Sequence, residues 1–150
     1  MVTLKEITTE NFWEVISLKV RDDQKNFVAS NAVSIAQSKV MPECIPLAIY
    51  NDDALVGFLM YCIDREDNNY WIYRLMIDTK FQSKGFGKKA MEIIIAKIKE
   101  DKSKNKIVTS AEPENSVAKK LYKKLGFKLT RELTGDPGDD DREEIMELEY

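Results

Sequence analysis

Residues 75–89 read Leu-Met-Ile-Asp-Thr-Lys-Phe-Gln-Ser-Lys-Gly-Phe-Gly-Lys-Lys. An apolar strand pattern ends here near Asp78, and two glycines separated by one residue, Gly85 and Gly87, stand at the entrance of a long helical pattern. Glycines at such a place let the backbone approach a ligand closely, and the amides of the first helical turn point at it with the helix dipole behind them. The segment therefore predicts an anion-binding loop between a strand and a helix.

The loop differs from two well-known phosphate-binding sequences. The Walker pattern Gly-x-x-x-x-Gly-Lys-Ser/Thr is absent, and the dinucleotide fingerprint would need a third glycine where this chain has Ala90. Glycines in a connection of this kind are also ordinary turn formers. Taken alone, the loop is compatible with a ligand site and with a plain turn.

Before the loop, the sequence predicts a strand at 2–7, a helix capped by Thr9, a helix at 26–39, a hairpin of strands at 46–50 and 54–63, and a strand at 70–77. Those after it are a helix at 86–100, a strand at 106–111, a helix at 116–125 stopped by Gly126, a strand that begins at Phe127, and a closing strand at 144–150. A strand, a long helix and a strand in the middle predict a parallel crossover in an otherwise antiparallel sheet. The fold class is α+β, with one domain over residues 1–150.

Composition excludes several classes of protein and of chemistry. The chain is 43% hydrophobic and 33% charged with 6 Gly and 4 Pro, so it is neither collagen-like nor of low complexity. It has no histidine, which excludes Ser-His and Cys-His catalytic pairs and imidazole metal sites. Cys44 and Cys62, without metal-ligand spacing, are expected to be buried thiols, and no metal is expected. Proton transfer must therefore use Glu, Asp, Tyr, Lys, Cys or water.

Charge and hydropathy indicate the surroundings in which the protein works. A net charge of −3 argues against general binding of nucleic acid. No apolar run approaches the roughly 18 residues of a membrane helix, and residues 1–6 lack a signal-peptide pattern, so we expect a cytoplasmic protein without membrane contact. Lysines crowd the middle of the chain and acids its end, which is compatible with solvated faces and also with one anionic and one cationic ligand.

A second segment makes the interpretation of the loop at 82–87 more specific. It is residues 115–127, Asn-Ser-Val-Ala-Lys-Lys-Leu-Tyr-Lys-Lys-Leu-Gly-Phe. The pattern Gln-x-x-Gly-x-Gly at 82–87, followed about thirty residues later by this segment, resembles the acetyl-coenzyme A signature of the GNAT family of N-acetyltransferases, and the resemblance covers nearly the whole chain. Within the family the chain looks most like bacterial spermine/spermidine acetyltransferases of the Bacillus multidrug-operon type. That closer resemblance rests on residues 18–24 with Phe27, and on residues 74–78.

The resemblance implies how acetyl-coenzyme A is held. The strand at 71–77 would bulge and splay away from the strand at 107–111, so that its unpaired backbone groups bind the pantetheine arm while amides of residues 83–88 receive the pyrophosphate. Asn115 would bond the pantetheine arm, although it is also suited to cap the next helix. The implied binding residues are Leu75, Met76, Ile77, Gln82, Ser83, Lys84, Gly85, Phe86, Gly87, Lys88, Asn115, Lys119 and Tyr122.

Three residues are candidates for the chemistry. Tyr122 matches the tyrosine acid of the family, because a phenol beside the sulfur can protonate the leaving thiolate; the alternative is a tyrosine packed in a helix stripe. The amide of Met76 would donate to the developing oxyanion in a direct attack through a tetrahedral intermediate. Glu112, at the end of a strand, is the candidate base for the amine, with a plain loop charge as the alternative.

The expected acceptor is a primary amine of a small polycation, above all spermine or spermidine. Carboxylates would hold its distal ammonium groups, and aromatic faces would contact its charge. The candidate residues are Asp22, Gln24, Glu43, Asp64, Glu66, Trp71 and Tyr73. A protein lysine or N-terminal amine, an aminoglycoside, and a non-catalytic acetyl-coenzyme A sensor remain open as alternatives.

Two further expectations concern the assembly and the acidic end of the chain. The family resemblance implies a homodimer. Residues 134–141 are expected to form a loop by their Gly and Pro content, and their spacing does not match a calcium-binding loop. They would be a solvated turn or one that attracts polyamine.

Overall fold

The computed structural model describes residues 1–133 and 142–150. Its strands form one sheet in the order β1-β2-β3-β4-β5-β7-β6. Their bounds are β1 Val2–Glu6, β2 Ile45–Asn51, β3 Ala54–Ile63, β4 Tyr70–Ile77, β5 Lys106–Ala111, β6 Lys128–Leu133 and β7 Glu143–Glu149. All neighbouring strands are antiparallel except β4 and β5, which are parallel. The predicted α+β fold, with a mixed and mostly antiparallel sheet, is confirmed.

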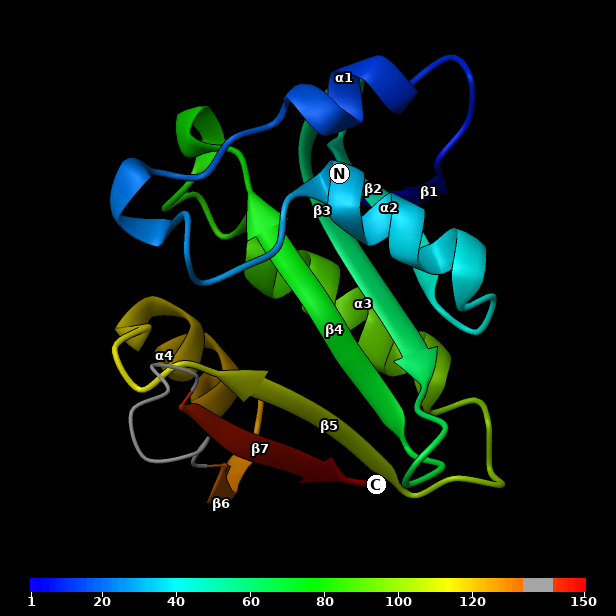
Figure 1. The fold of residues 1–150 in the computed structure, drawn as a ribbon, viewed down its shortest axis with the longest axis vertical. Helices are drawn as coiled ribbons and strands as arrows, with labels where there is room; N and C mark the ends of the chain where they lie inside the picture. Colours follow the sequence, from blue (N-terminus) through cyan, green and yellow to red (C-terminus); the bar gives the residue numbers. More distant parts are fainter. Residues whose placement is uncertain (134–141) are drawn as a thin grey trace.

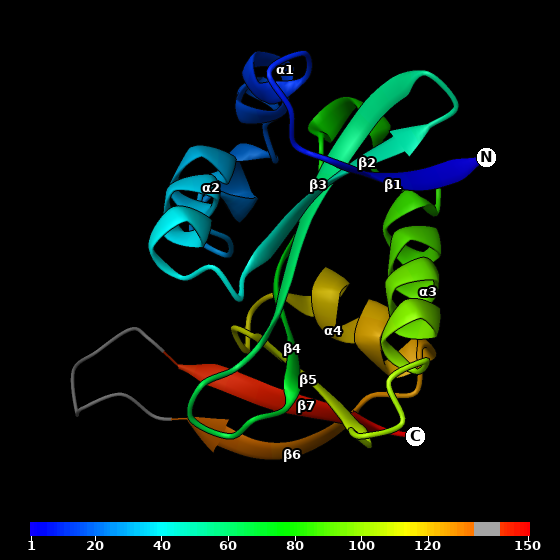
Figure 2. The same cartoon turned by 90° about the vertical axis from the view of Figure 1, so that its right-hand side faces the viewer.

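Helices cover both faces of this sheet. Their bounds are α1 Phe12–Ser17, α2 Asn31–Val40, α3 Phe86–Ile98 and α4 Ser116–Lys124, with short 3-10 helices at Asp22–Gln24 and Thr79–Phe81. Helices α1 and α2 lie on one face, and α3 and α4 on the other (Figure 1 and Figure 2). Each face has its own apolar cluster, because a sheet buried on both sides needs a cover on each. The molecule is thus a layered structure with the sheet in the middle.

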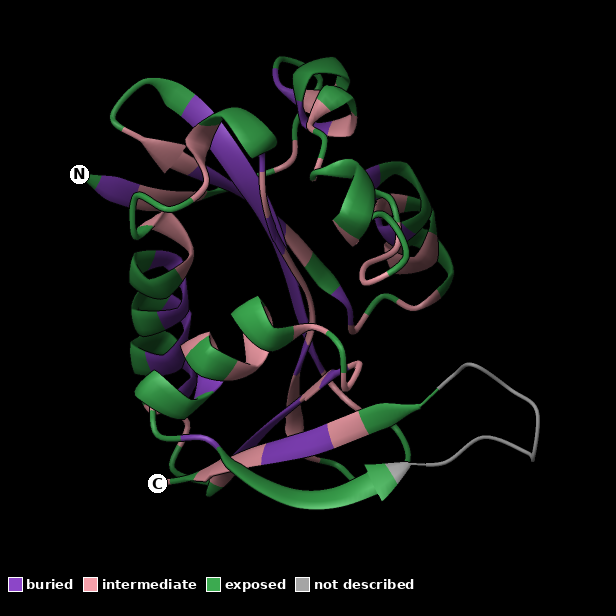
Figure 3. Ribbon diagram, turned by 90° about the vertical axis from the view of Figure 1, so that its left-hand side faces the viewer, coloured by how far each residue is buried: buried purple, intermediate pink, exposed green. Residues whose placement is uncertain are grey.

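The crossover around residues 75–89 has the predicted form. Strand β4 leads through α3 into the parallel strand β5, and β2, β3 and β4 form the expected meander. On α3, the residues Met91, Ile94 and Ile98 are almost fully buried. Figure 3 shows the buried stripe of α3 turned toward the sheet and its exposed stripe turned away, as expected for an amphipathic helix.

Helix α2 begins at Asn31 and not at Asn26 as predicted. Ser30 caps it, since the Ser30 Oγ accepts from the Val33 amide at 3.2 Å. The preceding residues instead form the 3-10 helix Asp22–Gln24, where Gln24 Oε1 accepts from the Arg21 amide at 3.3 Å. A strong cap and a side-chain-closed turn together override the apolar pattern between them, and residues 26–29 become connecting chain.

Thr9 does not cap α1, so this prediction is wrong. Asn11 stands at the cap position and makes no side-chain cap bond. Its Oδ1 accepts from the Thr8 amide at 2.8 Å and its Nδ2 donates to the Glu6 carbonyl at 3.0 Å. Asn11 therefore ties the end of β1 to the start of α1, and the backbone turns into the helix two residues later than Thr9 would allow.

Two further expectations concern residues 134–141 and contact with a membrane. Residues 134–141, expected to form an acidic loop, lie outside the described residues. Within the described ranges, the structure contains no helix that is both long and apolar enough to span a bilayer.

Candidate active site

Strands β4 and β5 separate in the middle of the sheet. They pair only from Tyr70 to Ile72 with Ile107 to Thr109. Next to the last pair, β4 carries an extra residue: Met60 of β3 faces Arg74 and Tyr61 faces Ile72, so Tyr73 bulges between them. Beyond the bulge the two strands run apart (Figure 1). The bulge and the splay that the family resemblance implied are both present.

The alternation of backbone groups decides which residues of β4 face the open side. The Asp78 amide donates to the Val56 carbonyl at 2.8 Å, so the same pattern directs Met76 toward Phe58 of β3. Leu75 and Ile77 must then present their N–H and C=O groups to the splayed side. This geometry moves the candidate oxyanion donor from the amide of Met76 to the amide of Leu75.

A pocket of about 880 Å³ begins at this open edge. It extends from the β4 edge to the loop at residues 82–88, called the glycine loop below, to the start of α4 and to the chain at 20–29. The predicted residues that line it are Gln24, Trp71, Tyr73, Leu75, Met76, Ile77, Gln82, Ser83, Gly85, Phe86, Gly87, Lys88, Glu112, Asn115 and Tyr122. Residues from five separate stretches of sequence therefore meet in one cavity.

The glycine loop has the backbone geometry of an anion cradle. Ser83 and Gly85 have positive φ angles of 64° and 82°, and α3 starts directly after Gly85 without a side-chain cap. The Lys89 amide is the first to bond within the helix, to the Gly85 carbonyl at 3.1 Å. The amides of Phe86, Gly87 and Lys88 thus precede the helical ladder and can receive phosphate oxygens, which the pyrophosphate of coenzyme A would supply.

Tyr122 lies buried on α4 and reaches the pocket at the point where the strands separate. Its ring packs on Phe127 with the centroids 5.7 Å apart. Burial raises the pKa of the Tyr122 phenol, and a hydrogen bond with Thr109 acts in the opposite direction. Thr109 is fully buried and also donates to the Ile72 carbonyl at 3.2 Å, at the last β4–β5 pair. The phenol is therefore a protonated donor held at the splay.

Thr109, which contacts Tyr122 and Ile72, was not among the residues predicted from the sequence. The only signal was a hydroxyl between the apolar positions of the strand Lys106–Ala111. Such a residue is common in strands, and nothing in the sequence shows that it faces Tyr122.

Asn115 caps α4, because its Oδ1 accepts from the Ala118 amide at 3.2 Å. The oxygen is therefore occupied by the cap, and Nδ2 is the atom that can donate to the pantetheine arm. Two predicted lysines do not line the pocket. Lys119 Nζ lies 3.1 Å from Glu144 Oε2 and donates to the Pro113 carbonyl at 2.9 Å, while Lys84 Nζ lies 5.9 Å from the centre of the Phe81 ring.

The acceptor side of the pocket is fastened to the glycine loop. Gln82 Nε2 donates to Gln24 Oε1 at 2.8 Å and to the Ile77 carbonyl at 3.0 Å. Asp78, which is buried, accepts from the Lys19 amide at 2.9 Å, and the Thr79 amide donates to the Lys19 carbonyl at 2.7 Å. These bonds fix residues 19–24 against the end of β4, so the acceptor side of the pocket and the glycine loop are held in a fixed relative position.

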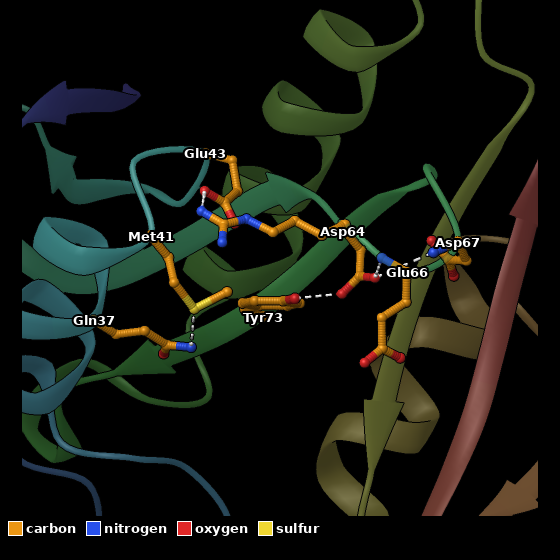
Figure 4. A network of polar contacts seen from close by, with 8 residues as sticks. Gln37, Met41, Glu43, Asp64, Glu66, Asp67 and Tyr73 are labelled. Carbon is orange, nitrogen blue, oxygen red and sulfur yellow. Dashed lines mark hydrogen bonds and ion pairs between the residues drawn. The ribbon is translucent and has the colours of Figure 1, made fainter.

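The carboxylates predicted to grip the acceptor lie outside the pocket wall. Asp22 pairs with Lys25 at 2.9 Å, Glu43 pairs with Arg65, and Asp64 accepts from the Tyr73 hydroxyl (Figure 4). Burial acts to raise the pKa of Asp64, but hydrogen bonds from Tyr73 and from the amides of Glu66 and Asp67 lower it. Glu66 is exposed, and its carboxylate points away from Tyr73 in Figure 4. Three of these carboxylates are therefore engaged by neighbouring side chains, and that of Glu66 points away from Tyr73. Tyr73 itself lines the pocket.

Arg74 lines the pocket beside these groups and has no role in the sequence-based prediction. Its Nη1 donates to the Tyr73 carbonyl at 2.9 Å and its Nη2 to Gln37 Oε1 at 3.3 Å. The signal available in the sequence was a single basic residue inside the aromatic and branched strand Tyr70–Ile77.

Comparison with known proteins agrees with this geometry. Residues 7–127 match the acetyltransferase (GNAT) family. A curated relative, the spermine/spermidine N(1)-acetyltransferase of Bacillus subtilis (strain 168), is 29% identical over 138 residues, which are 88% of this chain and 91% of the relative.

Solved structures show the same fold. The spermidine N-acetyltransferase of Vibrio cholerae, in complex with CoA and spermine, has a TM-score of 0.78 at 15% identity and covers 99% of this chain and 95% of its own. The aminoglycoside acetyltransferase AAC(6')-Ib, in complex with coenzyme A, has a TM-score of 0.80 at 16% identity with the same coverage. With its splayed strands, its glycine loop and its buried tyrosine, the chain belongs to the GNAT family and is an acetyl-coenzyme A-dependent N-acetyltransferase.

Proposed function

We propose that this enzyme acetylates a primary amine of a small polycation, with spermidine and spermine as the favoured acceptors. The observation that carries the proposal is one pocket in which the open edge of β4, the glycine loop and the buried Tyr122 meet. The choice of a polyamine is supported by the curated relative, which is named for spermine and spermidine.

The acetyl donor fits the pocket mainly through backbone groups. Leu75 and Ile77 offer N–H and C=O groups as if to an added strand, and the pantetheine arm contains amides that can pair with them. The Ile77 carbonyl already accepts from Gln82, so Leu75 offers the pair that needs no rearrangement. The amides of Phe86, Gly87 and Lys88 would hold the pyrophosphate, and Asn115 Nδ2 would donate to the arm.

The chain's own groups can carry out the transfer without a covalent enzyme species. The amine nitrogen bonds to the thioester carbon, and the carbon–sulfur bond breaks. The Leu75 amide donates to the carbonyl oxygen as negative charge develops there, and the Tyr122 hydroxyl gives its proton to the departing sulfur. The proton lost by the amine passes through water to Glu112, which lines the pocket at the end of β5.

Charges in the pocket suit a polyamine with more than one nitrogen. Glu112, directly after β5, and Glu143 of β7 line the pocket, as do Trp71 and Tyr73 of β4. Carboxylates attract the distal ammonium groups, and aromatic faces contact cations at low desolvation cost. Glu112 is the proposed base, so the carboxylate that would hold a distal ammonium group is Glu143 and not those of the β3–β4 turn.

The test is the release of free thiol from acetyl-coenzyme A with spermine, spermidine, a lysine peptide and an aminoglycoside. We expect turnover with the two polyamines and a fall in kcat of about 100-fold or more in Tyr122→Phe, because general acid catalysis typically contributes that much. Tyr70→Phe is the matched control: the Tyr70 hydroxyl donates to Asp101 at 3.0 Å, away from the pocket lining, so kcat should stay within about twofold.

Other outcomes would replace the proposal. Turnover with the lysine peptide alone would make the enzyme a protein acetyltransferase. Binding of acetyl-coenzyme A without turnover of any amine would indicate a sensor, and an unchanged kcat in Tyr122→Phe would remove the assigned acid.

A further inference from the structure

Arg74 is a half-buried cation directly beside the assigned reaction centre. It follows the bulged Tyr73 and precedes Leu75, whose amide faces the splay, and it lines the same pocket. Its Nη1 and Nη2 donate to neutral oxygens, the main-chain carbonyl of Tyr73 and the side-chain carbonyl of Gln37, and its Nε is buried without a hydrogen-bond partner. The guanidinium thus keeps its full positive charge at the acceptor end of the cavity.

Nearby carboxylates do not neutralise this charge. Asp64 accepts from the Tyr73 hydroxyl, Glu43 pairs with Arg65, and Asp23 pairs with Arg21 at 3.2 Å. Among the described residues, no ion pair includes Arg74. Holding a cation half-buried without a counter-ion costs free energy, which a purely structural role of Arg74 would not recover.

The reaction has a step that such a charge assists. A free alkyl amine has a pKa near 10.4, so it arrives as an ammonium that cannot attack a carbonyl. A fixed positive charge nearby destabilises the ammonium form, as does removal from water. Carboxylates act in the opposite sense, and the described carboxylates that line this pocket, Glu112 and Glu143, come from the end of β5 and from β7 and not from β4.

We propose that Arg74 is a specificity-determining residue that keeps the nitrogen beside Leu75 unprotonated and turns the remaining ammonium groups toward Glu143. The inference rests on the proposed function, since it assumes an acceptor with several amines. It gives the pocket a direction: the uncharged end of the substrate reacts at the cationic wall, and the charged end binds at the acidic wall.

The other groups around Arg74 leave it as the source of this field. From α2 the neighbour is the neutral Gln37, and from β3 the register partner is Met60. Cys44, in the chain after α2, also interacts with Arg74, and burial raises the pKa of its thiol. Tyr73 on β4 stays neutral, because burial and its bond to Asp64 raise its pKa. Arg21 on the loop is paired with Asp23, and Tyr122 stays neutral through burial. Lys88, Lys120 and Lys124 line the pocket from α3 and α4, near the glycine loop.

The experiment is a profile of kcat against pH with spermidine and saturating acetyl-coenzyme A, because kcat reports the protonation of the bound amine. In Arg74→Gln we expect the rising limb to move to higher pH by about one unit, the scale of a charge a few ångströms away in a partly hydrated site. At neutral pH kcat then falls about tenfold, and the gap to the wild type closes as pH rises. Arg74→Lys should keep the wild-type limb.

Arg21→Gln is the matched control, since it removes an arginine from the same pocket whose charge Asp23 already balances. Its limb should stay in place. A loss of kcat in Arg74→Gln by the same factor at every pH would mean a structural role and would overturn the inference. So would a rise in KM without a shift of the limb, which would show that Arg74 shapes the binding site and does not act on the protonation of the amine.

The two proposals fail in different ways. If spermidine is not acetylated, the proposed acceptor is wrong, and the same profile is recorded with whichever amine of the panel is turned over. If spermidine is acetylated and the limbs of the wild type and Arg74→Gln coincide, the acceptor stands and the role of Arg74 is wrong.

Discussion

Asn115 can serve the helix and the acetyl donor at once, because its two side-chain atoms do different work. Its Oδ1 caps α4, and its Nδ2 remains as a donor toward the pantetheine arm. We predict that Asn115→Ser and Asn115→Asp, which keep a capping oxygen, leave the melting temperature unchanged but raise the KM for acetyl-coenzyme A about tenfold. Thermal unfolding and steady-state kinetics check both numbers.

Asn115→Ala separates the two tasks, because it removes the cap as well. It should lower the free energy of unfolding by about 1 kcal/mol in addition to raising KM. Wild-type KM in Asn115→Ser would reduce Asn115 to a helix cap.

At the residue scale, the sequence predicted which residues meet in the pocket better than it predicted the register of β4. Tyr122, Asn115 and the glycine loop line one pocket, as the motifs indicated. The exchange of Met76 for Leu75 follows from the bulge at Tyr73, which shifts the alternation of β4 by one residue. A hydrophobic pattern contains no signal for such a bulge, so the facing of each amide could not be predicted.

Strand β4 depends on a glycine in the strand beside it. A Cβ at Gly57 would collide with the Met76 carbonyl and lie 2.8 Å from Ile77 Cδ1. We predict that Gly57→Ala lowers the free energy of unfolding by about 2 kcal/mol, since a backbone oxygen cannot move aside cheaply. It should also raise the KM for acetyl-coenzyme A, because the displaced segment carries Leu75 and Ile77.

Gly87→Ala is the control for this prediction. Its Cβ would meet Ile77 Cγ1 at 3.5 Å and Leu121 Cδ2 at 3.8 Å, which are ordinary contacts. The position lies in α3, where alanine is the better helix former, so denaturant unfolding should show equal or higher stability. Equal losses in both variants would contradict the collision at Gly57.

At the element scale, strands were easier to predict than the first helices. The aromatic and branched run 70–77 and the hairpin at 46–63 have strong β patterns, and the structure follows them closely. Between residues 26 and 30 the apolar pattern predicted a helix, but the chain before α2 follows contacts with distant residues: Asp78 binds Lys19, and Gln82 binds Gln24. Local propensity contains no record of such partners.

For the whole molecule, several weakly acidic side chains that are buried or half-buried make the fold sensitive to alkali. Burial raises the pKa of the Cys62 thiol to about 12 and that of the Tyr70 phenol to about 12, and it raises the pKa of Tyr122 as well. Their folded pKa values lie above the unfolded ones, so their contribution to stability is complete below pH about 9 and is lost as pH rises toward 12.

We therefore predict that the urea midpoint is constant between pH 7 and pH 9 and falls steeply by pH 11. Tyr70→Phe, which removes one titrating group, should show a smaller fall above pH 10. A midpoint that stays constant up to pH 11 would contradict the assigned burial of these groups.

The acceptor wall, meaning the side of the pocket that carries Tyr73 and Arg74, is the part of the whole molecule that was hardest to predict from the sequence. The carboxylates predicted to bind the acceptor, those of Asp22, Glu43 and Asp64, contact neighbouring side chains instead. Arg74 and Gln37 lie far apart in the sequence but form a hydrogen bond at the pocket. The donor side has a compact motif within residues 75–89, but the acceptor side is assembled from four or more elements. Only the tertiary arrangement brings these side chains together.

The open edge of β4 has a consequence for inheritance. The groups that we propose for binding the acetyl donor there belong to the main chain, and every point mutation except one to proline leaves the amide and carbonyl of Leu75 in place. The acceptor wall is built from side chains, so each substitution at Arg74 or Tyr73 alters it directly. Descendants of such a gene can change the amine they modify while they keep the reagent they modify it with.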